Sequence, residues 1–138
     1  MRFWDSSALV PLVTLEAWSG GAQALLAEDA EVAAWWATSI ECASAIVRKG
    51  HSGQPSTEQA LRELAELTTT WAEVPPTDRL RELAVRVVRV HELRTGDSLQ
   101  LAAAIVASEE RPETLELVTL DDRLALAASR EGFRVLPA

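Results

Sequence analysis

Four acidic residues are the side chains of this sequence best suited to do chemistry, because each lies where an apolar run gives way to a helical pattern. They are Asp5, Glu41, Asp97 and Asp121. Carboxylate oxygens are the ligands that hard cations such as Mg²⁺ prefer. Residues this far apart meet only in a fold that gathers their segments, as an open α/β sheet does at the carboxyl ends of its strands. The pattern predicts a divalent-metal site.

Three of the acids also have a simpler structural explanation. Glu41 matches the N3 position of a capping box that begins at Thr38. Asp97 and Asp121 would be favourable negative charges at helix N-termini. Taken singly, each of the three is therefore explained without any metal.

Asp5 is harder to explain as a structural residue. It directly follows the apolar pair Phe3–Trp4, and the next basic residue along the chain is Arg48. A carboxylate in such a place has to be paired with a distant cation, share a proton with another acid or hold a metal. We favour the metal.

The segments around the acids alternate between strand and helix patterns. Strands are expected at 2–4, 31–36, 73–74, 115–119 and 133–136, and helices at 16–27, 38–47, 56–71, 78–92, 99–106 and 123–130. A turn is expected at 50–55, and two helices are expected to meet at Asp97. Such alternation favours an α/β fold with three layers, in which helices cover a central, mainly parallel sheet of four to five strands.

Length and composition indicate one compact domain, residues 1–138. The chain has a mass of 15.0 kDa, and 48% of its residues are hydrophobic, which is enough for one sizeable core. Cys42 is the only cysteine, so no disulfide can form within the chain, and no cluster of Cys and His has zinc-ligand spacing. There is no signal-peptide pattern and no apolar run near the ~20 residues of a membrane span. We expect a cytoplasmic protein without a membrane contact.

The net charge of −8 argues, by itself, against a nucleic-acid surface. Bound divalent cations would offset that charge where it matters most, at the acids. Candidates to hold a nucleic-acid backbone are Arg48, Lys49, Arg86, Arg89, Arg94 and Arg123. The tryptophans could stack on bases, but most fall on predicted core faces, and His91 also lies on the apolar face of its helix.

The residues around the four acids resemble the four motifs of PIN domains, in the same order and over essentially the whole chain. The matching stretches are Asp5-Ser6-Ser7-Ala8-Leu9-Val10, Ile40-Glu41, Gly96-Asp97-Ser98-Leu99-Gln100-Leu101-Ala102-Ala103-Ala104 and Val118-Thr119-Leu120-Asp121. The chain looks like a VapC-type toxin ribonuclease of a type II toxin–antitoxin system. The resemblance implies a PIN-like fold, an RNA substrate, a cognate VapB-type antitoxin and a homodimer.

By that resemblance, Asp5, Glu41, Asp97 and Asp121 form an acidic quartet that binds one or two Mg²⁺ or Mn²⁺ ions, and Ser7 orients Asp5. Metal-assisted hydrolysis of RNA would then leave 5′-phosphate and 3′-hydroxyl ends. Asp122 is an additional acid without an assigned role. Two features depart from the family pattern: Cys42 stands beside Glu41, where an aliphatic residue is common, and the acidic chain has a single lysine.

Three alternatives remain open at the level of sequence. An aspartate-nucleophile phosphatase would need a second aspartate where Ser7 stands, and it would need a lysine late in the chain. A PIN-like nuclease acting on DNA would use the same metal chemistry. A protein that has lost activity could still bind an antitoxin, although the intact quartet argues against that loss.

Overall fold

The protein is built on a five-stranded sheet in which every pair of neighbouring strands is parallel. The computed structural model describes residues 1–50 and 55–138. The strands are β1 (Arg2–Trp4), β2 (Val32–Trp35), β3 (Ala72–Val74), β4 (Glu116–Val118) and β5 (Arg134–Leu136). Their order across the sheet is β3-β2-β1-β4-β5. The expected parallel sheet is confirmed.

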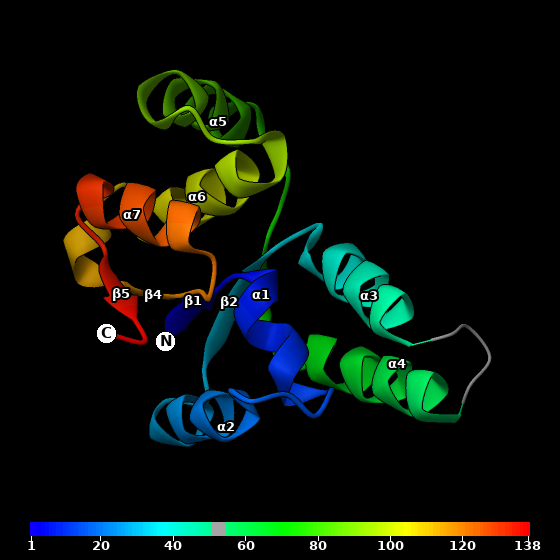
Figure 1. Ribbon diagram of the computed structural model, residues 1–138. Coiled ribbons are helices and arrows are strands. Elements are labelled where there is room, and N and C mark those ends of the chain that lie inside the picture. Colours follow the sequence, from blue (N-terminus) through cyan, green and yellow to red (C-terminus); the bar gives the residue numbers. More distant parts are fainter. Residues whose placement is uncertain (51–54) are drawn as a thin grey trace.

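Helices cover both faces of the sheet. They are α1 (Ser6–Leu9), α2 (Ser19–Glu28), α3 (Thr38–Lys49), α4 (Pro55–Thr68), α5 (Asp78–His91), α6 (Thr95–Ala107) and α7 (Asp122–Glu131), with the 3₁₀ turns η1 (Val10–Leu12) and η2 (Pro112–Thr114). Figure 1 shows α5, α6 and α7 on one side of the sheet and α1 to α4 on the other. The expected three-layer α/β fold is confirmed.

Alternation along β1 divides the interior into two cores. Successive side chains of a strand point to opposite faces, and both Phe3 and Trp4 are fully buried. Phe3 packs in the core beneath α5, α6 and α7, which includes Leu101 and Leu124. Trp4 packs in the core beneath α1 to α4, which includes Ile46 and Leu64. β1 is therefore buried on both faces, as a central parallel strand must be.

The strand order creates a topological switch point at β1. Within the sheet, β2 is the neighbour of β1 toward one edge, and β4 is its neighbour toward the other edge. Trp4 is in register with Val118, and the backbone N–H of Asp5 donates to the carbonyl of Val118 at 2.9 Å. Connections diverge at such a point, and ligands of open α/β sheets bind in the crevice outside the carboxyl ends of the strands there.

The capping box expected at Thr38 is wrong. Thr38 is the first residue of α3, and the residue before it, Ala37, has φ −85° and ψ 0° and makes no side-chain cap. A residue that caps through its side chain usually has extended backbone, as Asp5, Thr77 and Asp121 have here. Thr38 is instead fully buried against another helix.

Smaller differences concern the ends of elements. A short helix, α1, starts directly after Asp5 where a loop was expected, and α2 begins at Ser19 rather than at residue 16. α5 ends at His91 and α6 begins at Thr95, so Asp97 lies in the first turn of α6 rather than between two helices. The turn expected at 50–55 lies outside the described residues apart from its two ends. Each helix in the described ranges is too short or too polar to cross a membrane.

Candidate metal centre

Asp5 is held firmly at the end of β1. Its side chain is buried, and Oδ2 accepts hydrogen bonds from the hydroxyl of Ser7 at 2.5 Å, the hydroxyl of Thr119 at 2.8 Å and the backbone N–H of Ser7 at 3.3 Å. The contact with Ser7 is the one that the family resemblance implied. Burial raises the pKa of Asp5 and the charge of Asp121 raises it further, although the hydrogen bonds oppose both effects. The other oxygen, Oδ1, has a long contact of 3.4 Å with the hydroxyl of Ser6.

Glu41 lies in the first turn of α3 and is fixed from α6. The side-chain amide of Gln100 donates to Oε1 of Glu41 at 2.9 Å and to the hydroxyl of Thr38 at 3.0 Å. Burial raises the pKa of Glu41, and the charges of Asp5 and Asp97 raise it further. Gln100 thus joins the second turn of α6 to the first turn of α3.

Asp97 and Asp121 complete the cluster from the other side. Burial raises the pKa of Asp97, and the charges of Asp121 and Asp5 add to the shift, while Arg94 and Arg123 act in the opposite direction. Asp121 is the N-cap of α7, where its Oδ1 accepts from the backbone N–H of Leu124 at 2.9 Å. The helix-terminus explanation is therefore correct for Asp121, but the same residue also faces the other acids.

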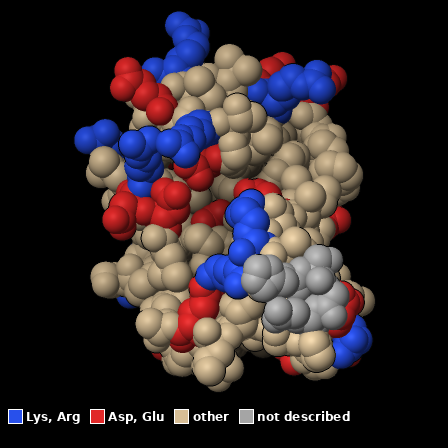
Figure 2. Space-filling model, turned by 45° about the vertical axis from the view of Figure 1, so that its right-hand side comes forward, with Lys and Arg blue, Asp and Glu red and all other residues tan. Residues whose placement is uncertain are grey.

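The four predicted acids are brought close enough to repel one another. They come from the ends of β1 and β4 and from the first turns of α3 and α6. None of them forms an ion pair with any residue between 1 and 50 or between 55 and 138. In Figure 2, acidic side chains gather around a recess in the surface, and basic side chains stand on both sides of it.

The chemistry of this donor set fits a hard divalent cation, because clustered carboxylates without a cationic partner are what such ions bind. The side chains are not yet arranged as a finished site, since no three Asp, Glu, His or Cys side chains in the described ranges are grouped to hold a metal. The carboxylates would have to come closer together to surround an ion.

Cys42 and Asp122 lie next to the quartet. Cys42 is buried behind Glu41, and burial together with the charges of Asp5 and Glu41 raises its pKa to about 12. The thiol therefore stays protonated near neutral pH. Asp122 is exposed in the first turn of α7, and it lines a shallow pocket of about 250 Å³ with Asp97 and Asp121.

Sequence reasoning missed two residues that position the acids. Thr119 donates to Asp5, and its hydroxyl also accepts from the backbone N–H of Asp121 at 3.0 Å, so it links two members of the quartet. Gln100 lies three residues after Asp97 on the same side of α6. The sequence held a signal for each of them. Thr119 is a hydroxyl residue at the end of a strand, and Gln100 is a buried polar residue one helical turn from an acid.

The structure separates the candidate basic residues into two groups. Arg86 is paired with Glu131, and Lys49 is paired with Glu16. The others make no ion pair with the described residues; they are Arg48, Arg89, Arg94 and Arg123. Of the tryptophans, Trp4, Trp35 and Trp71 are buried as expected, whereas Trp36 is 49% exposed.

Comparison with solved structures identifies the fold. VapC20 of Mycobacterium tuberculosis, described as a sarcin–ricin loop cleaving toxin, matches with a TM-score of 0.67 and 20% identity over 96% of each chain. A toxin–antitoxin complex from Klebsiella pneumoniae matches with a TM-score of 0.65 and 21% identity, over 88% of this chain and 87% of that one. PAE2754 from Pyrobaculum aerophilum matches with a TM-score of 0.67 and 21% identity, over 91% of this chain and 84% of that one.

No protein-family model and no curated protein matched the sequence. The structural matches confirm the PIN-like, VapC-type fold that the sequence motifs predicted.

Proposed function

We propose that this protein is a metal-dependent endoribonuclease of the VapC toxin type, acting as a single domain in the cytoplasm. The observation that carries the proposal is the convergence of Asp5, Glu41, Asp97 and Asp121 from four separate elements onto the edge of the sheet where β1 and β4 end. None of the four forms an ion pair with another described residue. Mg²⁺ or Mn²⁺ is the cofactor that this donor set favours.

The protein's own residues prepare the quartet for that task. Ser7 and Thr119 hold Oδ2 of Asp5, Gln100 holds Oε1 of Glu41, and the first turn of α7 holds Oδ1 of Asp121. Each of these carboxylates thus has at least one oxygen held in place by a hydrogen bond from a neighbouring residue. A bound divalent cation would supply positive charge to the phosphate and lower the pKa of a nearby water.

The proposed substrate is RNA and the proposed partner is a VapB-type antitoxin, with the active protein a homodimer. The fold shared with a toxin described as cleaving the sarcin–ricin loop supports the first, and the fold shared with a toxin–antitoxin complex supports the second. The guanidinium groups of Arg94 and Arg123 flank Asp97, make no ion pair within residues 1–50 and 55–138, and would contact the RNA backbone.

The test is cleavage of total cellular RNA by the purified protein with Mg²⁺, with Mn²⁺ and with chelator, alongside Asp5→Asn. We expect metal-dependent cuts with 5′-phosphate ends that are absent in Asp5→Asn. Cleavage of single-stranded DNA in preference to RNA would indicate a DNA nuclease instead. Intact nucleic acid in every lane would leave a non-catalytic, antitoxin-binding protein as the better explanation.

A further inference from the structure

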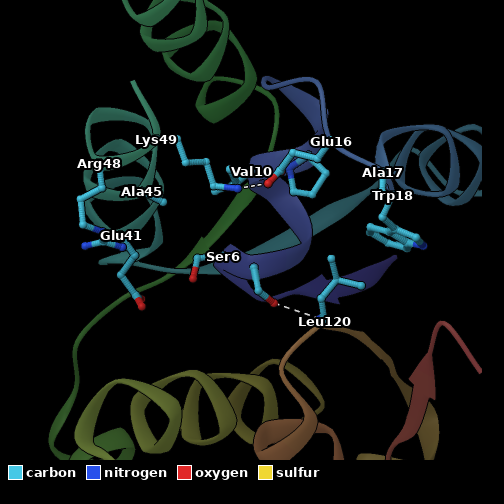
Figure 3. Close-up of a pocket in the computed structure, with 12 residues that line it drawn as sticks. Ser6, Val10, Glu16, Ala17, Trp18, Glu41, Ala45, Arg48, Lys49 and Leu120 are labelled. Carbon is cyan, nitrogen blue, oxygen red and sulfur yellow. Dashed lines mark hydrogen bonds and ion pairs between the residues drawn. The ribbon is translucent and has the colours of Figure 1, made fainter. Parts of the chain in front are cut away.

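An open pocket lies directly beside the carboxylate cluster. Its volume is about 700 Å³, and it lies between α3 and the segment that joins η1 to α2. Figure 3 shows Glu41, Ala45 and Arg48 along one wall and Trp18 on the opposite side, with Ser6 between the walls. Because Glu41 and Ser6 line both the pocket and the cluster, a chain that crosses the cluster can continue into the pocket.

Trp18 forms a fixed wall of this pocket. A Cβ atom added at Gly21 would lie only 2.5 Å from Nε1 of Trp18 and 2.9 Å from Cδ1, so the indole rests against bare backbone of α2. The ring is also packed against the core beneath α1 to α4, and it remains partly exposed toward the pocket. A restrained, accessible indole face suits the stacking of an unpaired base.

Two cationic groups stand at the mouth of the pocket and differ in their partners. Lys49 is paired with Glu16 across the opening, as the dashed line in Figure 3 indicates. Arg48 donates to the hydroxyl of Ser44 at 2.7 Å and makes no ion pair with the described residues. Arg48 is therefore the charge available to an incoming phosphate.

We propose that this pocket receives one unstacked nucleotide of the RNA substrate, with the base against Trp18 and its phosphate at Arg48. This inference rests on the proposed function. It adds to that function the path of the RNA, which runs from Arg94 and Arg123 across the acids to Trp18. Single-stranded RNA is commonly recognised through splayed bases stacked on aromatic rings, and an arginine beside the ring holds the backbone.

The first test fills the pocket without removing any existing contact. In Ala45→Leu the larger side chain occupies the space of the base. We measure cleavage of a short single-stranded RNA of random sequence and hydrolysis of bis(p-nitrophenyl) phosphate, a diester without a base. The ratio of the two rates should fall about 10-fold in Ala45→Leu, the loss expected for one stacked base. Ala65→Leu on the exposed side of α4 is the matched control and should keep the wild-type ratio.

The second test addresses Arg48. Arg48→Gln should raise KM for the RNA more than it lowers kcat, and it should reduce the slope of log affinity against log salt by about 0.7, the value of one single-strand phosphate contact. Arg62→Gln on α4 is the matched control, since Arg62 is exposed and donates a hydrogen bond to Gln59 on its own helix. A wild-type salt slope in Arg48→Gln would remove Arg48 from the proposal.

Binding of the same RNA in the presence of chelator separates this inference from the proposed function. Weaker binding by Ala45→Leu than by wild type supports the pocket even if no RNA is cleaved. Equal binding by wild type, Ala45→Leu and Arg48→Gln overturns it. Equal RNA binding together with loss of a co-purifying polypeptide from Ala45→Leu would assign the pocket to a protein partner instead.

Discussion

The two ends of α7 place carboxylates in opposite surroundings. At its start, Asp121 belongs to a cluster of acids that repel one another and have no ion-pair partner among the described residues. At its end, Glu131 accepts from Arg86 at 2.8 and 3.2 Å and contacts Nε2 of His91 at 2.7 Å. The hydrogen bond from Arg86 lowers the pKa of Glu131. One end of the helix stabilises the fold, and the other keeps charge available for a ligand.

The largest effect on RNA cleavage is expected from substitutions in the quartet. Asp5→Asn and Asp97→Asn should each lower RNA cleavage more than about 100-fold, because loss of a metal ligand should cost at least as much as loss of a group that supports one. Circular dichroism should show an unchanged fold. Asp122→Asn is the matched control, and it should retain most activity because its side chain is exposed beside the cluster. Full activity in either quartet variant would remove that residue from the proposed site.

Neutralising Glu131 at the end of α7 and Asp97 in the acidic cluster should change the free energy of unfolding in opposite directions. Glu131→Gln should lower the free energy of unfolding by about 1 kcal/mol, because it weakens charged hydrogen bonds that join α5 to α7. Asp97→Asn should raise the stability of the metal-free protein by less, because it relieves repulsion at a partly exposed site. Urea unfolding in chelator measures both, and a destabilised Asp97→Asn would show that the repulsion does not matter.

The same contrast predicts an unusual pH profile. The raised pKa values of Asp5, Glu41 and Asp97 mean that the folded state binds protons more tightly, so the metal-free protein should gain stability as the pH falls from about 7 toward the ordinary carboxylate range near about 4. The lowered pKa of Glu131 acts in the opposite direction, and its contribution should be lost below that range. Thermal unfolding in chelator at a series of pH values checks this. Saturating Mg²⁺ should reduce the gain in stability between pH about 7 and about 4.

The smallest expected effect distinguishes a paired arginine from an unpaired one. Arg123→Gln should raise KM for RNA about threefold and leave stability unchanged, since a surface phosphate contact contributes modestly. Arg86→Gln should lower the stability of the protein and leave KM for RNA unchanged, because the partner of Arg86 is Glu131. Equal effects of both changes on KM would contradict the proposed path of the RNA.

Much of the fold could be predicted from the sequence, because its signals are local. Short apolar runs such as 32–35, each followed by a helical pattern, are sufficient to indicate buried parallel strands. The acids were also recognisable, since each follows a strand or starts a helix. What brings them together is the strand order, which no local pattern specifies.

The positioning residues depend on geometry between elements and were harder to predict. Gln100 contacts Thr38 and Glu41 across 62 and 59 residues of sequence. The capping box at Thr38 failed for a related reason, because the backbone entering α3 at Ala37 is not extended. His91 was expected in the core, and its ring is indeed only 5% exposed, but its partner is the carboxylate of Glu131.

The position of β1 in the middle of the sheet also bears on synthesis of the chain. Asp5 directly follows β1, yet β4, which pairs with β1 and leads to Asp121, emerges from the ribosome more than a hundred residues later. Until then Asp5 lacks its hydrogen bond from Thr119, and the quartet has three members at most. A nascent chain therefore cannot assemble the complete acidic cluster before β4 and Asp121 have been made, so the ribosome that is translating it would be protected from the proposed RNA cleavage until then.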